Sequence, residues 1–124
     1  MLTLPLLTTV TVGNHLLTAA EQAAGAPQRP PFVDEAGDPV DPDTVQIVLT
    51  APTGEDRSYG YPAAGPDDAG TVTRQEAGRY YVQLAPGEGE DGLWRWYLVG
   101  QMELGTGWSD QAVFYAQRPI APGP

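Results

Sequence analysis

The densest group of side chains that could do chemistry lies in the first half of the chain. Five carboxylates fall within ten residues and could offer oxygen ligands to Ca²⁺, namely Asp34, Glu35, Asp38, Asp41 and Asp43. Their spacing does not match the EF-hand loop, and Pro39 and Pro42 restrict how the side chains can converge. Aspartate beside glycine and proline is the usual composition of a turn. We therefore expect a turn here and no metal ion, with a Ca²⁺ site as the alternative.

His15 is the only histidine of the chain. A Ser-His-Asp arrangement would have to use Ser58 or Ser109, and neither serine sits in a Gly-x-Ser-x-Gly elbow. We interpret His15 as a packing or surface residue. The sequence thus indicates no catalytic residue and no cofactor, and we expect a protein that is not an enzyme. A small hydrolase that uses two carboxylates is the least favoured alternative.

The aromatic side chains could instead bind a sugar or a protein. After Gly92 the alternation of the chain places Trp94, Trp96 and Leu98 on one face of a strand. That face is the expected core, because a buried tryptophan is common in β-sandwiches. The other face carries Leu93, Arg95, Tyr97 and Val99, and we expect Arg95 and Tyr97 to face outward beside Tyr81. Trp108 follows Gly105-Thr106-Gly107 in an expected loop, and we interpret it as an interface residue.

Length and composition limit the classes of partner. A chain of 124 residues forms one domain with room for an arm. It has no cysteine, which excludes disulfides and thiolate metal sites, and its 15 glycines and 13 prolines indicate many turns and little helix. The net charge is −10 and the basic residues are six arginines without a lysine. Such a chain should repel nucleic acid and anionic membranes, so we expect neither as a partner.

Residues 1–31 read as an N-terminal arm with a proline-rich linker. The segment from Met1 to Ala20 lacks the charged start of a signal peptide and the roughly 20 apolar residues of a membrane helix. Asn14 could cap a short helix from His15 to Ala24, which would end at Gly25. Two interpretations stay open for the apolar part before it. Either it supplies an edge strand to the sandwich, or it docks on a neighbouring subunit.

Residues 32–119 carry the signals of about seven antiparallel strands, and residues 120–124 form a tail. The clearest strand runs from Thr44 to Thr50, with Val45, Ile47 and Leu49 facing inward. Further strands are expected over 57–61, 71–75, from Gly78 through Leu84, from Gly92 through Leu98, and over 111–117. Turn signals separate them at short spacing. The fold class is therefore all-β, an antiparallel β-sandwich preceded by an extended arm.

The turns and aromatics carry a family resemblance. The order Phe32-x-Asp34-x-x-Gly37-x-Pro39-Val40-Asp41-Pro42-x-Thr44-Val45, then Ala51-Pro52-Thr53-Gly54, Gly78-Arg79-Tyr80 and Gly92-Leu93-Trp94-Arg95-Trp96, resembles a small Ig-like domain of tailed-phage virion structural proteins. The resemblance covers roughly residues 32–119. It implies a domain that decorates capsids, tail tubes or connectors and has no catalytic residues to carry over. The start of this chain departs from that pattern, because an apolar arm and a linker stand where a first strand is usual.

These observations lead to the expectation of a virion structural protein, assembled in the host cytoplasm, that decorates or cements a capsid. Major capsid or other virion proteins would be its partners, and it would form a homo-oligomer in the assembly. A head-to-tail connector or tail-associated protein is one alternative, and a carbohydrate-binding or adhesion module that uses Tyr81, Tyr97 and Trp108 is another. The residues expected to bind the partner are the apolar side chains of the arm together with one tryptophan: Leu2, Leu4, Leu6, Leu7, Val10, Val12, Leu16, Leu17 and Trp108.

Overall fold

Nine strands and one short helix make up the described part of the chain. The computed structural model describes residues 2–102 and 107–117 of the 124. The elements are β1 (Leu2–Pro5), β2 (Val10–Gly13), α1 (Ala19–Ala23), β3 (Thr44–Thr50), β4 (Asp56–Tyr61), β5 (Gly70–Thr71), β6 (Thr73–Glu76), β7 (Arg79–Leu84), β8 (Gly92–Gln101) and β9 (Gly107–Gln117).

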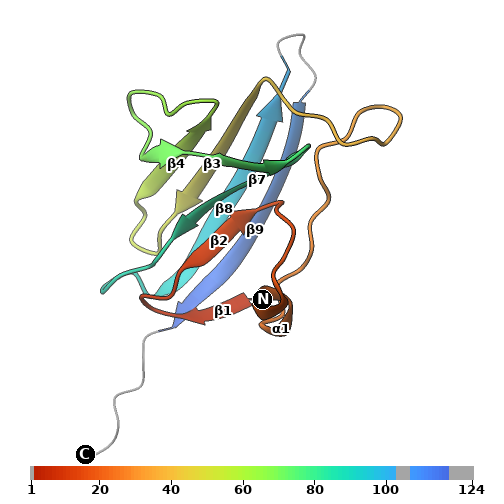
Figure 1. Ribbon diagram of the computed structural model, residues 1–124. Coiled ribbons are helices and arrows are strands. Elements are labelled where there is room, and N and C mark those ends of the chain that lie inside the picture. The colour runs from red at the N-terminus through yellow and green to blue at the C-terminus, as the bar shows by residue number, and fades with distance from the viewer. Residues whose placement is uncertain (1, 103–106, 118–124) are drawn as a thin grey trace, which may run out of the picture.

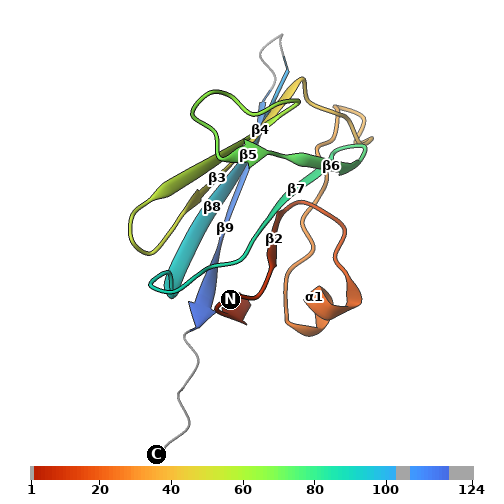
Figure 2. The same cartoon turned by 60° about the vertical axis from the view of Figure 1, so that its left-hand side comes forward.

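The strands form two sheets that pack face to face. The larger sheet has six strands in the order β1-β9-β8-β3-β4-β5, and the smaller has three in the order β2-β7-β6. Figures 1 and 2 show the smaller sheet lying across the long strands β8 and β9. Most neighbours are antiparallel, whereas β1 runs parallel to β9 and β5 parallel to β4. The all-β sandwich expected from the sequence is therefore confirmed, with more strands than the seven expected.

The core lies between the two sheets and follows the alternation of the sequence. β3 begins and ends where the sequence analysis placed it, and Val45, Ile47 and Leu49 are buried. Trp94 is fully buried and stacks on Phe114, with ring centroids 5.7 Å apart. The smaller sheet covers this layer with its own buried side chains, which are Val10, Val12, Tyr80 and Val82.

Residues 2–13 do not form an arm in front of the sandwich. β1 pairs with the end of β9, from Leu2 opposite Phe114 to Pro5 opposite Gln117, and so becomes an edge strand of the larger sheet. β2 pairs with β7 in the smaller sheet, from Val10 opposite Leu84 to Gly13 opposite Tyr81. Alternation puts apolar side chains of this segment into the core, and that burial outweighs an extended conformation in solvent. The edge-strand interpretation therefore holds for β1, and the sandwich begins before residue 32.

The helix is shorter than expected and begins at another residue. Thr18, not Asn14, is its N-cap. The Thr18 side chain accepts a hydrogen bond from the Glu21 amide, and the Glu21 carboxylate accepts one from the Thr18 amide. This reciprocal capping box fixes the start of α1. The end agrees with the sequence, since Gly25 follows with a φ of 87°, a conformation that glycine adopts without a steric penalty.

Candidate functional site

The outward face of β8 and β9 carries apolar side chains where a solvated sheet would carry polar ones. The register pairs Leu93 with Tyr115, Arg95 with Val113 and Tyr97 with Gln111, and all six point away from the core. The exposed fractions are 37% for Leu93, 42% for Tyr97, 42% for Val113 and 38% for Tyr115. We call these four side chains, with Arg95 among them, the outer apolar face. An antiparallel sheet with one solvated face normally alternates apolar and polar residues, so this face is an exception.

The face is hollowed at its centre. A shallow depression of about 580 Å³ runs over it, lined by Thr50, Leu93, Arg95, Trp96, Tyr97, Gln111, Ala112 and Val113. A depression bordered by aromatic and aliphatic side chains can receive an anchoring side chain of a partner protein.

Arg95 stands at the centre of this face and has no partner among the described residues. Among the residues that the structure describes, it makes no hydrogen bond or ion pair. Each other described arginine is engaged: Arg29 with Asp110, Arg57 with Glu90, Arg74 with Asp41, and Arg79 with the carbonyls of Asn14 and Arg29. In a chain of net charge −10, an arginine left free of carboxylates is available to one from outside.

Carboxylates are scarce on the same face. Along the described outward positions of the six-stranded sheet the one acidic residue is Asp56 on β4, which β3 separates from Arg95. Its carboxylate already accepts a hydrogen bond of 2.7 Å from the Thr50 hydroxyl. Depletion of charge together with aromatic side chains and arginine is the composition of the centre of a protein interface.

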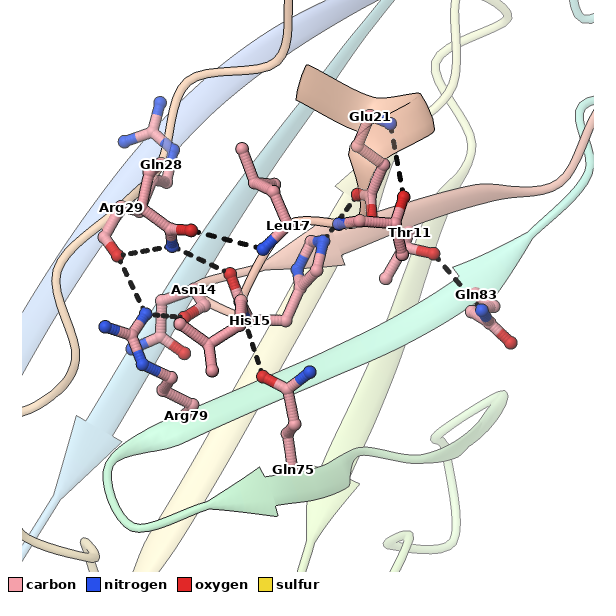
Figure 3. Close-up of polar contacts among 12 residues, drawn as sticks. Thr11, Asn14, His15, Leu17, Glu21, Gln28, Arg29, Gln75, Arg79 and Gln83 are labelled. Atoms are coloured by element: carbon pink, nitrogen blue, oxygen red, sulfur yellow. Dashed lines mark hydrogen bonds and ion pairs between the residues drawn. The ribbon is translucent and has the colours of Figure 1, made fainter. Parts of the chain in front are cut away.

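A second concave region lies at the side of the sandwich, between β2, the α1 segment and β9. This side pocket has a volume of about 420 Å³ and is lined by apolar groups that include Val10, Val12, Trp96 and Phe114. Its polar rim is formed by His15, Glu21 and Arg29. Figure 3 shows the hydrogen bonds that hold this rim in place.

The side chains of the rim form hydrogen bonds with neighbouring polar side chains. His15 Nε2 lies 2.6 Å from Glu21 Oε2, and the His15 ring meets Tyr81 edge-on with centroids 6.0 Å apart. Burial raises the pKa of Glu21, but the hydrogen bonds from His15 and Thr18 outweigh it and hold that pKa below its ordinary value. Arg29 donates two hydrogen bonds of 2.7 Å to Asp110 and stacks over Trp96. His15 is 6% exposed, and its Nδ1 is buried without a hydrogen-bond partner among the described residues.

Asn14 ties this segment to the smaller sheet. It is 1% exposed, its side-chain oxygen accepts a hydrogen bond of 2.8 Å from the Tyr80 amide, and its side-chain nitrogen donates to the carbonyls of Gly78 and Pro30. The expectation that Asn14 caps a helix was wrong, because its side chain satisfies buried backbone groups of β7 and the turn before it.

The acidic segment is used for turns and for one cross-link. Asp34 accepts hydrogen bonds from the amides of Ala36 and Asp38 and so closes its own turn. Within residues 2–102 and 107–117 no group of three or more acidic or histidine side chains converges as a metal site would require. The structure therefore offers no arrangement for the alternative of a Ca²⁺ site in the part it describes.

Asp41 is the cross-link. Its carboxylate accepts hydrogen bonds from Arg74, from the Gly78 amide at 3.0 Å and from the Tyr80 hydroxyl at 2.9 Å. The bond from Arg74 is the main cause of a lowered pKa of Asp41, with burial opposing it and the other two donors assisting. Burial, followed by the hydrogen bond to Asp41, raises the pKa of the Tyr80 hydroxyl far above its ordinary value.

The residues expected to bind a partner fall into four groups. Val10 and Val12 are buried in the core of their own chain, so the prediction that they contact a partner was wrong for this fold. Leu4 and Leu6 pack partly against the same core, and Leu17 lines the side pocket. Leu7 and Leu16 remain available, at 72% and 45% exposed. Leu2 lies in β1 and Trp108 lies in β9 opposite Gly100, in a strand instead of the expected loop, and their side chains are outside the described part.

Sequence reasoning missed all four apolar side chains of the outer apolar face as partner-binding residues. It placed Leu93 and Tyr97 outward, but it did not propose them, Val113 or Tyr115 as partner-binding residues. The signal was present, because Val113 and Tyr115 alternate with Ala112, Phe114 and Ala116. A strand that is apolar on both faces departs from the alternation of an antiparallel sheet with one solvated face.

Tyr81 and Tyr97, two of the three aromatic residues expected in a carbohydrate-binding module, do not lie on one surface. Tyr97 points outward from the larger sheet, whereas Tyr81 points outward from the smaller sheet and contacts His15. The expectation that Arg95 and Tyr97 lie beside Tyr81 was therefore wrong, because the core of the sandwich separates the two faces.

Comparison with known proteins gives no relative from which a role could be transferred. The chain matches no family model, no curated protein and no solved structure. In the described residues no helix is long and apolar enough to cross a membrane.

Proposed function

We propose that the protein is a non-enzymatic virion structural protein that decorates or cements a capsid, and that it attaches through its outer apolar face. The observation that carries this proposal is the group Leu93, Tyr97, Val113 and Tyr115 around Arg95, which has no partner within residues 2–102 and 107–117. Covering these side chains removes apolar surface from water, which is the main favourable term in protein association. The virion setting rests on the sequence resemblance to small Ig-like virion domains.

The attachment differs from the arm docking expected from the sequence. Most of the apolar side chains of residues 2–13 stabilise the chain's own sandwich. The outer apolar face on β8 and β9 therefore makes the contact with the capsid in this proposal. Leu7 and Leu16 are the described leucines of the N-terminal segment whose side chains remain exposed. We propose that the capsid surface presents a carboxylate opposite Arg95, since a desolvated arginine–carboxylate pair fixes orientation.

The acidic remainder of the surface fits a protein present in many copies. A net charge of −10 keeps the chain soluble at high local concentration and discourages non-specific binding to packaged nucleic acid. Many identical weak contacts on one lattice then act together through avidity.

Quantitative mass spectrometry of particles purified from cells that carry the gene tests this proposal. A copy number close to that of the major capsid protein is expected. Far fewer copies would transfer the proposal to a head-to-tail or tail-associated position. Absence from all particles, together with a monomeric chain in solution, would contradict the virion setting.

Variants of the face test the mode of attachment in the same particles. Arg95→Glu should abolish incorporation, because the proposed carboxylate would then repel it, while Arg95→Lys should retain part of it. Tyr81→Thr on the opposite sheet is the matched control and should incorporate normally. Normal incorporation of Arg95→Glu would contradict attachment through this face.

A further inference from the structure

Leu7 is held in an unfavourable backbone conformation in the short connection between β1 and β2. Its φ is 64°, in the left-handed region that leucine rarely occupies. Its side chain is 72% exposed, so burial of that side chain does not offset the strain. Its amide donates a hydrogen bond of 2.7 Å to the Pro86 carbonyl, which fixes the strained residue in place.

The strand in front of this connection is weakly held. β1 has four residues, ends in Pro5 and pairs in parallel with β9 alone. The strand after the connection is firmly held, since Val10 and Val12 of β2 are buried in the core and β2 pairs antiparallel with β7. Leu7 therefore separates a strand that can leave from a strand that stays.

We infer that β1 exchanges between copies of this chain, so that β1 of one copy pairs with the end of β9 of a second copy. A second copy is the occupant that the site fits best, because its Leu2–Pro5 would remake every pairing with Phe114–Gln117. The exchange also lets Leu7 relax, and short strained hinge connections favour strand swapping.

The neighbouring part of β9 is closed to such pairing. The Gln111 amide is capped by its neighbour Asp110 at 2.8 Å, and Asp110 is held by Arg29. A charged side chain of this kind blocks the edge of a sheet. Exchange is therefore directed to Phe114–Gln117, the segment that becomes free when β1 departs. This inference does not depend on the proposed role of the outer apolar face.

Cysteine cross-linking tests the exchange directly, because the chain has no cysteine of its own. Full-length Leu4→Cys and Ala116→Cys chains are mixed and oxidised, since these two residues face each other across β1 and β9. Exchange predicts a disulfide between the two chains, well above the yield for Leu4→Cys mixed with Ser58→Cys on β4. The double variant in one chain shows that the pair can close. A double variant that closes within one chain, with mixed chains that link no more than the control, would overturn the inference.

Hinge variants give a second readout that does not rely on disulfide geometry. Leu7→Gly removes the left-handed penalty and should lower the dimer fraction, measured by light scattering, about tenfold in its equilibrium constant. Leu7→Ala keeps the penalty and removes the exposed side chain, so its dimer fraction should match that of the unmodified chain. Equal dimerisation of the glycine and alanine variants would overturn the inference. So would an unmodified chain that stays monomeric at all concentrations.

Discussion

The side pocket and the outer apolar face adjoin the same two strands, β8 and β9, yet they differ in whether their charged side chains have partners. At the side pocket, charged and polar groups pair with each other: His15 with Glu21, and Arg29 with Asp110. On the outer apolar face, Arg95 has no partner within the described residues, and the tyrosines around it lie open to solvent.

This difference separates a structural role from a binding role. In the side pocket most of the described polar groups already have partners, with His15 Nδ1 as an exception, so a ligand finds few polar contacts to form there. On the outer apolar face, covering the exposed apolar area and pairing Arg95 with a carboxylate would both favour association with another surface. We therefore interpret the side pocket as a structural contact region of the fold, and we propose the outer apolar face as the interface.

Asn14→Ala, beside the side pocket, should cause the largest loss of stability. The substitution leaves the buried Tyr80 amide without its partner. It also removes one of two hydrogen bonds to the Gly78 carbonyl, which keeps the bond from the Phe32 amide, and it should lower the free energy of unfolding by about 3 kcal/mol. Urea unfolding measures this. Gln83→Ala is the control, because it removes an exposed hydrogen bond of 3.2 Å to Thr11 and should cost less than about 0.5 kcal/mol. Equal losses would show that Asn14 is not the tie we describe.

Asp41→Asn should cost about 1–2 kcal/mol, since the carboxylate accepts several hydrogen bonds but is half-exposed and screened by solvent. The pKa of Asp41 is lowered in the folded state, so its contribution is complete above the ordinary aspartate pKa of about 4. The contribution is lost as the pH falls through the lowered value.

Unfolding of the unmodified chain and of Asp41→Asn should therefore converge in acid. Thermal unfolding across the acid range checks this, with Asp67→Asn in an exposed loop as the control. A stability difference that persists unchanged into strong acid would contradict the role given to the carboxylate.

The outer apolar face should show the smallest effect on stability. Tyr97→Thr and Val113→Thr keep β-forming side chains at exposed positions and should change the free energy of unfolding by less than about 0.5 kcal/mol. The same variants should nevertheless lose incorporation into particles. Large destabilisation with normal incorporation would reverse the roles of the two regions.

The sequence predicted well what depends on alternation. The strand Thr44–Thr50 and the inward Trp94, Trp96 and Leu98 were confirmed, because the burial of alternate side chains is written directly into the residue pattern. The fold class followed from the same pattern.

What the sequence could not provide depends on contacts between distant residues. Asn14 satisfies backbone groups 64 and 66 positions away, at Gly78 and Tyr80, and a capping residue looks the same locally. The placement of β1 beside β9 joins the two ends of the chain, which no local signal records. For the same reason the four side chains of the outer apolar face, which come from two strands, were recognised as one surface only in the fold.

Oxidative footprinting of tyrosines tests the central claim most directly. Side-chain labelling of Tyr97 and Tyr115 is compared between the free chain and the chain in purified particles, with Tyr81 on the opposite sheet as the internal control. If the outer apolar face is the interface, Tyr97 and Tyr115 are strongly protected in the particle and the labelling of Tyr81 is unchanged. Equal labelling of Tyr97 and Tyr115 in both states would contradict the assignment of the outer apolar face as the interface.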